Sequence, residues 1–492
     1  MYVYQLSKAF CLLDTTHSMA NHHQYEPENA PKQPEVMVVM VPLTAQGHLN
    51  ELLHFSRLIC AYNIPVHYLS YAVHIRQAKL RVHGWDPAAV PNLHFHECAA
   101  PSFPSPPPNP NAPTNFPGHL QPLFDSLSDL REPVTSLLRS LSAAARRIVV
   151  VYDSLIASVV QDVESIPNAE CYEFISISAF FNFFYFWELM GKPMAVEAEV
   201  LEGLPTLEDC LTPEFTEFMT KQLDFGKFRA GYLLNTCKAI EGRYIDLLAK
   251  PEILNTDKLW AIGPFHPLTL NKDHNHFKPR HECLEWLDKQ APNSVIYVSF
   301  GTTTSLSDEQ IKELADGLER SHQKFIWVLR DADRGDIFAG EGETTARKEK
   351  LAAETFQGRG MVVADWAPQL EVLAHRSTGG FLTHCGWNSC MESISMGVPM
   401  AAWPMHSDQP RNAHLVAKVL GVGLVVRDWE RRKEVVGASE VEDVVRRLMD
   451  SDEGERMRKR AGELGSAVRQ EAAEGGVSCR ELDSFVVHIS RF

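Results

Sequence analysis

Residues 35–62 read EVMVVMVPLTAQGHLNELLHFSRLICAY, and this stretch decides the fold class. Its first part, Glu35–Leu43, is a nearly continuous apolar run, which is typical of a strand buried on both faces of a parallel sheet. After a short turn, apolar residues recur at helical spacing from His48 onward. A buried strand followed at once by a helix is the first part of a βαβ unit, so the sequence predicts a doubly wound α/β domain.

The same alternation of strands and helices continues along the chain. Further strands are expected at 66–69, 93–96, 147–152, 294–300, 324–329, 360–364 and 380–383. A polar linker at 271–281 separates two similar halves, so we predict two Rossmann-like domains that face each other across a cleft. The predicted units are a disordered extension (1–34), an N-terminal α/β domain (35–256), a C-terminal α/β domain (257–465) and a helix that packs back on the first domain (466–492).

The composition excludes several classes of protein. Among 492 residues, 47 are Lys or Arg and 63 are Asp or Glu, which gives a net charge of −16. A chain this acidic, with no basic run longer than 431–433, does not suit nucleic acid or an anionic membrane. No apolar run approaches the ~18–20 residues of a membrane span. The ten cysteines have neither a C-x-x-C pair nor zinc-site spacing, so we expect reduced thiols, a cytoplasmic location and no metal site.

Two ionisable residues of the first half follow the carboxyl ends of predicted strands, where ligands bind in open α/β sheets. His48 follows strand 35–43, and Asp153 follows strand 147–152. At the start of a helix, the dipole disfavours imidazolium and is expected to keep His48 neutral and able to accept a proton. A carboxylate on the other ring nitrogen would orient the ring and stabilise the imidazolium. The structural alternative is a helix-terminal histidine and an aspartate that caps the next helix.

The segment 366–409, WAPQLEVLAHRSTGGFLTHCGWNSCMESISMGVPMAAWPMHSDQ, carries a second group of candidates. Strand 380–383 ends at His384, and a helix is expected to start soon after it. Gly386 permits a ligand to approach the backbone, and the free N–H groups of a helix start favour phosphate. His384, Asn388 and Ser389 add side-chain donors there, so the sequence predicts a diphosphate site. For Ser389 the alternative is a capping box with Glu392.

Polar and aromatic residues at two other predicted strand ends complete this group. Trp366 follows strand 360–364 and offers a flat face for a nucleotide base, although packing is an alternative. Asp408 and Gln409 follow an expected strand at 399–403. A carboxylate beside an amide suits sugar hydroxyls, but a turn explains the pair almost as well.

The order of residues in 366–409 resembles the signature box of the plant family-1, UDP-sugar-dependent glycosyltransferases. PLTAQGHLN at 42–50 resembles the loop that bears the histidine of that family, and VSFGTT at 298–303 resembles its first C-domain loop. The resemblance implies the GT-B fold and inverting, metal-independent transfer of a sugar from a UDP-sugar to a small hydroxylated acceptor. It implies no cofactor beyond the UDP-glucose donor, and we expect a monomer.

Position by position, the resemblance makes His48 the general base and Asp153 its partner. It implies the following donor contacts: Trp366 for uracil, Gln369 and Glu392 for the ribose, Thr302 or Thr303 with His384, Asn388 and Ser389 for the diphosphate, and Trp387, Asp408 and Gln409 for the sugar. Ala367 and Gly386 belong to the same donor-binding set. A glutamine at position 409 favours glucose over galactose and does not exclude xylose.

Stretches at 48–70, 104–117, 120–141 and 146–170 resemble the zeatin O-glucosyl- and O-xylosyltransferases of that family. The resemblance makes 35–256 the acceptor-binding domain and 257–465 the UDP-sugar-binding domain. Because these stretches lie in the acceptor-binding domain, the expected acceptor is the side-chain hydroxyl of a zeatin-type cytokinin. The expected sugar is glucose. The alternatives are a flavonoid or another phenol as acceptor, and transfer of xylose.

Three other segments remain, and the first two have two interpretations each. The aromatic run 180–187 favours core packing over the wall of an acceptor pocket, because aromatic stripes usually bury themselves. The Pro-rich loop 101–118 lies either over the acceptor cleft or on the surface as a stiff connection. The charged loop 331–350 is expected to be a solvated insertion.

Two rival functions are disfavoured by the sequence. A nicotinamide-dependent oxidoreductase would need a G-x-G-x-x-G turn after a leading strand, and neither half has one. A catalytically silent binding protein of the same fold would be expected to lack His48 or Asp153, and both are present.

Overall fold

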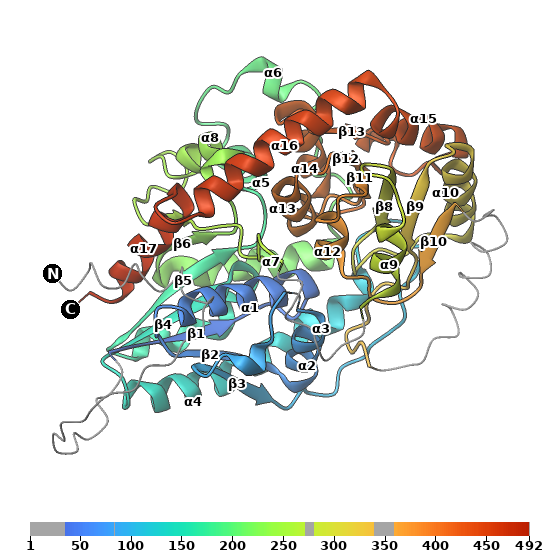
Figure 1. Cartoon of the computed structure of the whole chain (residues 1–492). Helices are drawn as coiled ribbons and strands as arrows, with labels where there is room; N and C mark the ends of the chain where they lie inside the picture. The colour runs from blue at the N-terminus through green and yellow to red at the C-terminus, as the bar shows by residue number, and fades with distance from the viewer. Residues whose placement is uncertain (1–34, 83, 271–279, 339–358, 492) are drawn as a thin grey trace, which may run out of the picture.

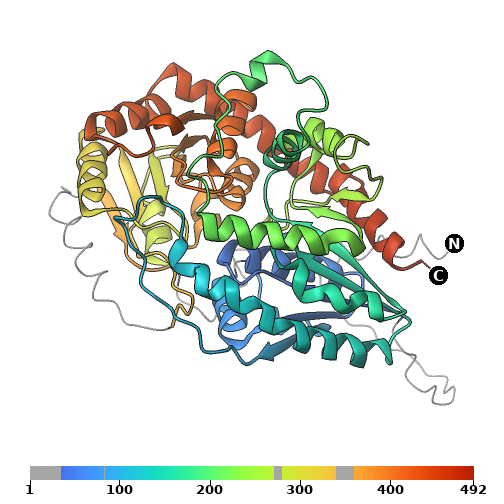
Figure 2. The ribbon, with the colours of Figure 1, turned by 180° about the vertical axis from the view of Figure 1, so that it is seen from behind.

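The computed structural model describes residues 35–82, 84–270, 280–338 and 359–491 as two lobes, each built around one parallel sheet (Figure 1). Figure 2 shows the same two lobes from behind. The arrangement confirms the prediction of two Rossmann-like domains. The expected extension 1–34 lies outside the described residues, as do most of the expected linker and the second part of the charged loop.

The first sheet has seven parallel strands in the order β3-β2-β1-β4-β5-β6-β7. They are β1 (Val36–Val41), β2 (Val66–Tyr71), β3 (Leu93–Cys98), β4 (Arg147–Asp153), β5 (Ala169–Ile175), β6 (Arg229–Leu234) and β7 (Leu259–Ala261). β1 lies between β2 and β4, so Val38, Val39 and Met40 are fully buried, as the apolar run predicts. The strand order reverses between β1 and β4, and doubly wound sheets bind ligands at the carboxyl edge of such a switch point.

The second sheet has six parallel strands in the order β10-β9-β8-β11-β12-β13. They are β8 (Val295–Ser299), β9 (Lys324–Val328), β10 (Gly360–Val363), β11 (Thr378–Thr383), β12 (Met400–Ala402) and β13 (Gly423–Val425). The order reverses between β8 and β11. The segments that follow these two strands contain the residues expected to bind the diphosphate, so each sheet contributes its switch point to the predicted site.

Helices connect the strands in both domains. Those of the first domain are α1 (Gln46–Cys60), α2 (Ala72–Arg81), α3 (Gln121–Ser126), α4 (Arg131–Ser142), α5 (Ala179–Leu189), α6 (Ala198–Leu201), α7 (Pro213–Phe225) and α8 (Lys238–Leu248). The second domain contains α9 (Glu282–Asp288), α10 (Asp308–Arg320), α12 (Gln369–Leu373), α13 (Trp387–Met396), α14 (Gln409–His414), α15 (Ala438–Met449) and α16 (Asp452–Ala472), and α17 (Val477–Ile489) follows. α13 ends at Gly397, whose φ of +76° favours glycine.

Two predicted domain boundaries do not coincide with the structure. β7 falls in the predicted second domain, but it pairs with β6 as the edge strand of the first sheet, and its Trp260 packs into that core. Helix α16 runs through the predicted boundary at residue 465, and α16 and α17 cross from the second lobe to the first (Figure 1). A local apolar pattern predicts a strand or a helix but does not say which sheet it joins.

The aromatic run on α5 belongs to the core, which confirms the prediction of core packing. Phe180, Phe183 and Phe184 are fully buried, and Trp187 is 5% exposed. The Phe180 ring packs edge-on against Tyr244 of α8, with centroids 4.8 Å apart. These rings therefore fill the space between two helices of the first domain.

Helix α17 is fixed to the first domain by Phe485, and this contact gives a prediction for stability. The Phe485 side chain is fully buried, and its ring lies 5.2 Å from that of Tyr172 and 5.3 Å from that of Trp260. Replacing Phe485 by alanine should lower the free energy of unfolding by about 3–5 kcal/mol, because it leaves a cavity between aromatic rings. Denaturant titration measures this loss. Val487 of the same helix is 60% exposed, so Val487→Ala is the matched control and should change little; equal losses would contradict the packing argument.

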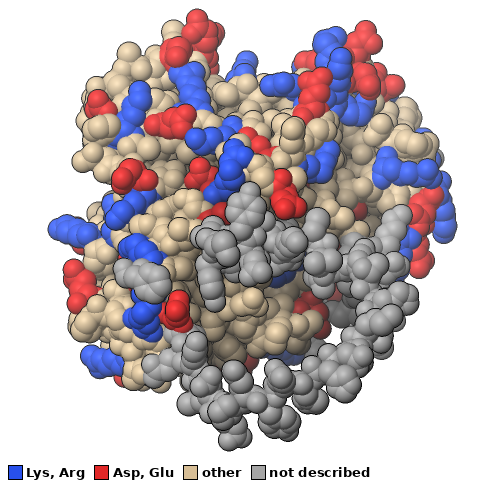
Figure 3. All heavy atoms as spheres, turned by 60° about the vertical axis from the view of Figure 1, so that its left-hand side comes forward, with Lys and Arg blue, Asp and Glu red and all other residues tan. Residues whose placement is uncertain are grey.

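The charged side chains do not form a continuous basic surface on the face shown in Figure 3, where Lys and Arg alternate with Asp and Glu. In the part of the chain that the structure describes, every helix is too short or too polar to cross a membrane.

Candidate active site

His48 and Asp153 meet at the switch point of the first sheet. α1 begins at Gln46, so His48 lies in its first turn, and Asp153 is the last residue of the neighbouring strand β4. Nδ1 of His48 lies 2.6 Å from Oδ2 of Asp153. The other carboxylate oxygen accepts a hydrogen bond from the Leu155 backbone N–H at 3.0 Å. Asp153 therefore binds the histidine and also caps the following helical segment, so both interpretations of this residue hold.

The pKa of His48 differs in direction from the prediction. Burial lowers the pKa of the imidazole, but the carboxylate of Asp153, with a smaller effect of Asp408, raises it above the ordinary value of 6.5. Asp153 is fully buried, whereas the imidazole is 21% exposed. A helix dipole is worth only about 0.3–1 kcal/mol at an exposed site, so a buried carboxylate in direct contact outweighs it. The expectation that the dipole controls the protonation of this ring is therefore wrong.

The loop between β11 and α13 has the features of the predicted diphosphate site. Gly386 is the N-cap of α13, whose first N–H groups point out of the helix. A Cβ atom on Gly386 would lie 2.6 Å from Nε2 of His384, and one on Gly301 would lie 2.5 Å from it. The imidazole thus fits between two loops only because both positions are glycine. Burial lowers the pKa of His384 to about 4, so the ring is neutral at pH 7.

Asn388 and Ser389 lie in the first turn of α13. Nδ2 of Asn388 donates a hydrogen bond to the carbonyl of Gly47 at 2.8 Å, and this contact brings the two switch points together. Ser389 lies inside the helix and not at its N-cap, so the alternative of a capping box with Glu392 is wrong. Instead, Nε2 of Gln369 donates to Ser389 at 3.1 Å and to Glu392 at 2.7 Å. The two side chains expected at the ribose are therefore in contact, and burial raises the pKa of Glu392 to about 7.

Asp408 and Gln409 lie at the start of α14. The carboxylate of Asp408 accepts a hydrogen bond from Nδ2 of Asn412 at 2.6 Å, and burial raises its pKa to about 6. Oε1 of Gln409 accepts from the backbone N–H groups of Met405 and His406 at 2.9 and 3.0 Å. Nε2 of Gln409 lies 3.4 Å from each ring nitrogen of His406, so the turn accounts for both ends of this amide.

Trp387 corrects one of the predicted roles. Its indole is 3% exposed and donates from Nε1 to the backbone carbonyl of Asn235 at 2.9 Å. The side chain therefore packs between the domains and does not face the sugar, because Asn235 belongs to the first domain.

Thr303, which was expected near the diphosphate, contacts a histidine of the second domain. Oγ1 of Thr303 lies 3.2 Å from Nε2 of His406, and burial lowers the pKa of that imidazole to about 3.

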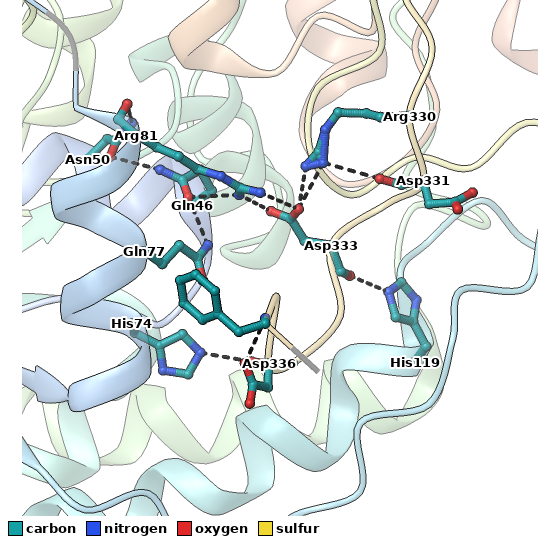
Figure 4. A network of polar contacts seen from close by, with 12 residues as sticks. Gln46, Asn50, His74, Gln77, Arg81, His119, Arg330, Asp331, Asp333 and Asp336 are labelled. Carbon is teal, nitrogen blue, oxygen red and sulfur yellow. Dashed lines mark hydrogen bonds and ion pairs between the residues drawn. The ribbon is translucent and has the colours of Figure 1, made fainter. Parts of the chain in front are cut away.

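Arg81 and Asp333, which no sequence pattern singled out, form an ion pair that joins the two domains (Figure 4). Arg81 ends α2 and donates to both carboxylate oxygens of Asp333, at 2.5 and 3.0 Å. The two side chains are 11% and 10% exposed. The guanidinium carbon of Arg81 lies 4.7 Å from the centre of the Trp366 ring. Asp333 follows the end of β9, so the strand-end rule that selected Asp153 was the available signal.

The prediction that 331–350 is a solvated insertion is wrong for the residues that the structure describes. The carbonyl oxygen of Asp333 lies 2.8 Å from Nε2 of His119, and that of Gly335 lies 2.9 Å from Nε2 of His74. Both histidines belong to the first domain. A charged run looks solvated by composition alone, but here its backbone and its charges have partners on the other domain. Residues 339–350 lie outside the described residues.

The Pro-rich loop 101–118 contacts the second domain at two places. The Asp336 backbone N–H donates to Oγ of Ser105 at 3.1 Å, and Nδ2 of Asn115 lies 3.8 Å from Sδ of Met405. The ring of Phe116 packs edge-on against His406, with centroids 5.7 Å apart. The end of the loop therefore lies against the segment that leads to Asp408, which favours a position over the cleft.

Comparison with known proteins identifies the class of this protein. Residues 34–267 match the family model of the glycosyltransferase N-terminal domain, and residues 240–446 match that of UDP-glucoronosyl and UDP-glucosyl transferase. The zeatin O-glucosyltransferase of Phaseolus lunatus is 54% identical over 94% of this chain and 99% of its own. The zeatin O-xylosyltransferase of Phaseolus vulgaris is 53% identical over 93% of this chain and 98% of its own. The chain belongs to the UDP-glycosyltransferase family, which agrees with the sequence resemblance.

A solved structure agrees with the fold. The crystal structure of TcCGT1 in complex with UDP superimposes with a TM-score of 0.71 at 25% sequence identity, over 93% of this chain and 99% of that one. The two facing domains are therefore a GT-B fold. The protein is an enzyme that transfers a glycosyl group from a UDP-sugar to a small acceptor.

Proposed function

We propose that this enzyme is an inverting O-glucosyltransferase that transfers glucose from UDP-glucose to the side-chain hydroxyl of a zeatin-type cytokinin. The observation that carries the proposal is the 2.6 Å contact between His48 and Asp153, at the start of α1, where Asn388 of α13 donates to the carbonyl of Gly47. Similarity to the two Phaseolus enzymes extends over the acceptor-binding half as well as the donor-binding half, which supports the acceptor.

On the acceptor side, Asp153 keeps a proton on Nδ1 of His48, so Nε2 can accept the proton of the acceptor hydroxyl. The acceptor oxygen attacks the anomeric carbon of the sugar while the bond from that carbon to the diphosphate oxygen breaks. Attack and departure on opposite faces invert the configuration. Assistance by the base is worth about 10²–10⁴-fold, and fixing two substrates across the cleft contributes further.

On the donor side, the backbone N–H groups at the start of α13 and neutral side chains would stabilise the charge that develops on UDP. Neutral donors suit a chain whose net charge is −16. The donor contacts are those implied by the family resemblance, except that Trp387 contributes its backbone. UDP-glucose serves as a substrate, and we propose no cofactor.

Xylose is a second candidate for the transferred sugar. A relative of nearly equal identity is an O-xylosyltransferase. The family resemblance, in which a glutamine at this position goes with glucose, supports glucose for this chain through Gln409.

A mass-resolved turnover assay tests the proposed function. UDP-glucose and UDP-xylose are offered with trans-zeatin, cis-zeatin, dihydrozeatin, a flavonoid and a simple phenol. We expect one hexose on the side-chain oxygen of a zeatin and slower reaction of the phenols. Reaction of the phenols alone would contradict the cytokinin assignment, and faster transfer from UDP-xylose would contradict the choice of glucose.

We also propose that the enzyme works as a monomer in the cytoplasm. The cysteines of the described ranges are unpaired, which suits a reducing compartment. Light scattering on a size-exclusion column tests the oligomeric state.

A further inference from the structure

Arg81 contacts three parts of the proposed site at once, and Figure 4 shows two of them, Gln46 and Asp333. Its Nη1 donates to Oε1 of Gln46 at 3.1 Å, and both terminal nitrogens donate to Asp333. Its guanidinium also lies over the Trp366 ring. Gln46 is the first residue of α1, and His48 follows two positions later in the same helical turn. One guanidinium therefore links the proposed uracil platform to the helix that carries the proposed base.

Asp333 makes the matching connection on the donor side. Its backbone N–H donates to the carbonyl of Thr302 at 2.7 Å, in the loop proposed to contact the diphosphate. Its carboxylate also binds Arg330, whose guanidinium carbon lies 6.0 Å from the centre of the Trp366 ring. Asp333 thus contacts the Thr302 loop through its backbone N–H and the two guanidinium groups beside Trp366 through its carboxylate.

The hydrogen bonds of Arg81 also hold its guanidinium over Trp366. Arg81 makes three hydrogen bonds with a charged donor, each about as strong as the stacking of one base on an aromatic ring. Stacking of one uracil ring would not repay the loss of all three. We therefore expect Arg81 to keep its place over Trp366 when the donor binds.

We propose that Arg81 and Asp333 are positioning residues for sugar transfer, which set the placement of Trp366 relative to the His48 helix. This inference rests on the proposed function, since it takes Trp366 as the uracil platform and His48 as the base. The pair touches neither the acceptor hydroxyl nor the anomeric carbon. Its effect is to hold a donor bound in one domain in line with a base carried by the other.

Substitution of Arg81 tests the proposal with two separate measurements. In Arg81→Met, the Kd for UDP measured by calorimetry should rise about tenfold, because the cation on Trp366 is lost. The value of kcat should fall about 10–100-fold, because the two domains lose their alignment, while KM for the acceptor stays unchanged. Arg81→Lys keeps the positive charge but loses the paired hydrogen bonds to the two carboxylate oxygens of Asp333. Its kcat and its Kd for UDP should therefore lie between those of wild type and Arg81→Met. In the double variant Arg81→Met with Asp333→Asn, kcat and the Kd for UDP should be close to those of Arg81→Met alone, since the two side chains act together.

The matched control is an interdomain ion pair that contacts neither Trp366 nor α1. Arg432 and Asp209 lie 2.7 Å apart with side chains 12% and 24% exposed, and Arg432→Met should leave kcat and UDP affinity unchanged. Tighter UDP binding in Arg81→Met would overturn the proposal, because Arg81 would then cover the base-binding face. A lower melting temperature with unchanged kcat and Kd would also overturn it. Wild-type protein that binds UDP but transfers no sugar would instead contradict the proposed function.

Discussion

Replacing His48 by alanine should lower kcat by about 10²–10⁴-fold and leave the Kd for UDP unchanged. The base is lost, whereas the proposed donor contacts lie on the other domain, around α13 and Trp366. Turnover is measured with saturating UDP-glucose and acceptor, and UDP binding by calorimetry in the absence of acceptor. The two measurements separate a defect in proton transfer from a defect in donor binding.

The matched control is His94→Ala, which removes an exposed histidine from the edge strand β3 of the same sheet. Its kcat should equal that of the wild type. Wild-type turnover in His48→Ala would contradict the assignment of His48 as the base. A large rise of the Kd for UDP in that variant would show instead that the substitution disturbs the contact between Gly47 and Asn388.

Replacing Asp153 by asparagine should lower kcat by about 10²-fold or more. The side chain is fully buried, and an amide of the same shape can still accept the hydrogen bond from the Leu155 N–H. Its N–H₂ group, however, would donate to Nδ1 of His48 and place the ring proton on Nε2, where the acceptor hydroxyl must donate. The fold is therefore expected to survive while the base is in the wrong tautomer.

The pH profile of the same variant gives a second readout. Only the neutral ring accepts a proton, and the pKa of His48 is raised above 6.5, so wild-type kcat/KM should fall as the pH drops through a value above 6.5. Without the charge of Asp153, burial lowers the pKa and is opposed only by the smaller effect of Asp408. The acid limb of Asp153→Asn should therefore move to lower pH, below 6.5. An acid limb that stays in place would contradict the assignment of this limb to His48.

Much of the site could be predicted because its signals are local. The strand-end rule selected His48 and Asp153, and the start of α13 was recognisable from Gly386 and the donors that follow it. The same rule applied to β9 would have selected Asp333. Arg81 carries no such signal, because it ends a surface helix and its partner is 252 residues away in the chain.

The errors have a common physical origin. The charged run after Asp331, the side chain of Trp387 and the protonation of His48 each depend on a group from another element or domain. In the first two cases that group belongs to the opposite domain, and in the third it is Asp153. Burial at such contacts changes the strength of charges and hydrogen bonds, and sequence spacing does not report it.

The amino-acid sequence by itself determined the two α/β domains, the order of the donor-binding residues and the pair that forms the proposed base. Apolar periodicity and the chemistry of helix starts act within a few residues, so they are visible in the printed chain. The tertiary contacts alone show which charges face each other across the domains, that a guanidinium lies over Trp366 and that Asp153 raises the pKa of His48. These properties follow from how two separately encoded surfaces pack together, and that packing has no local signature.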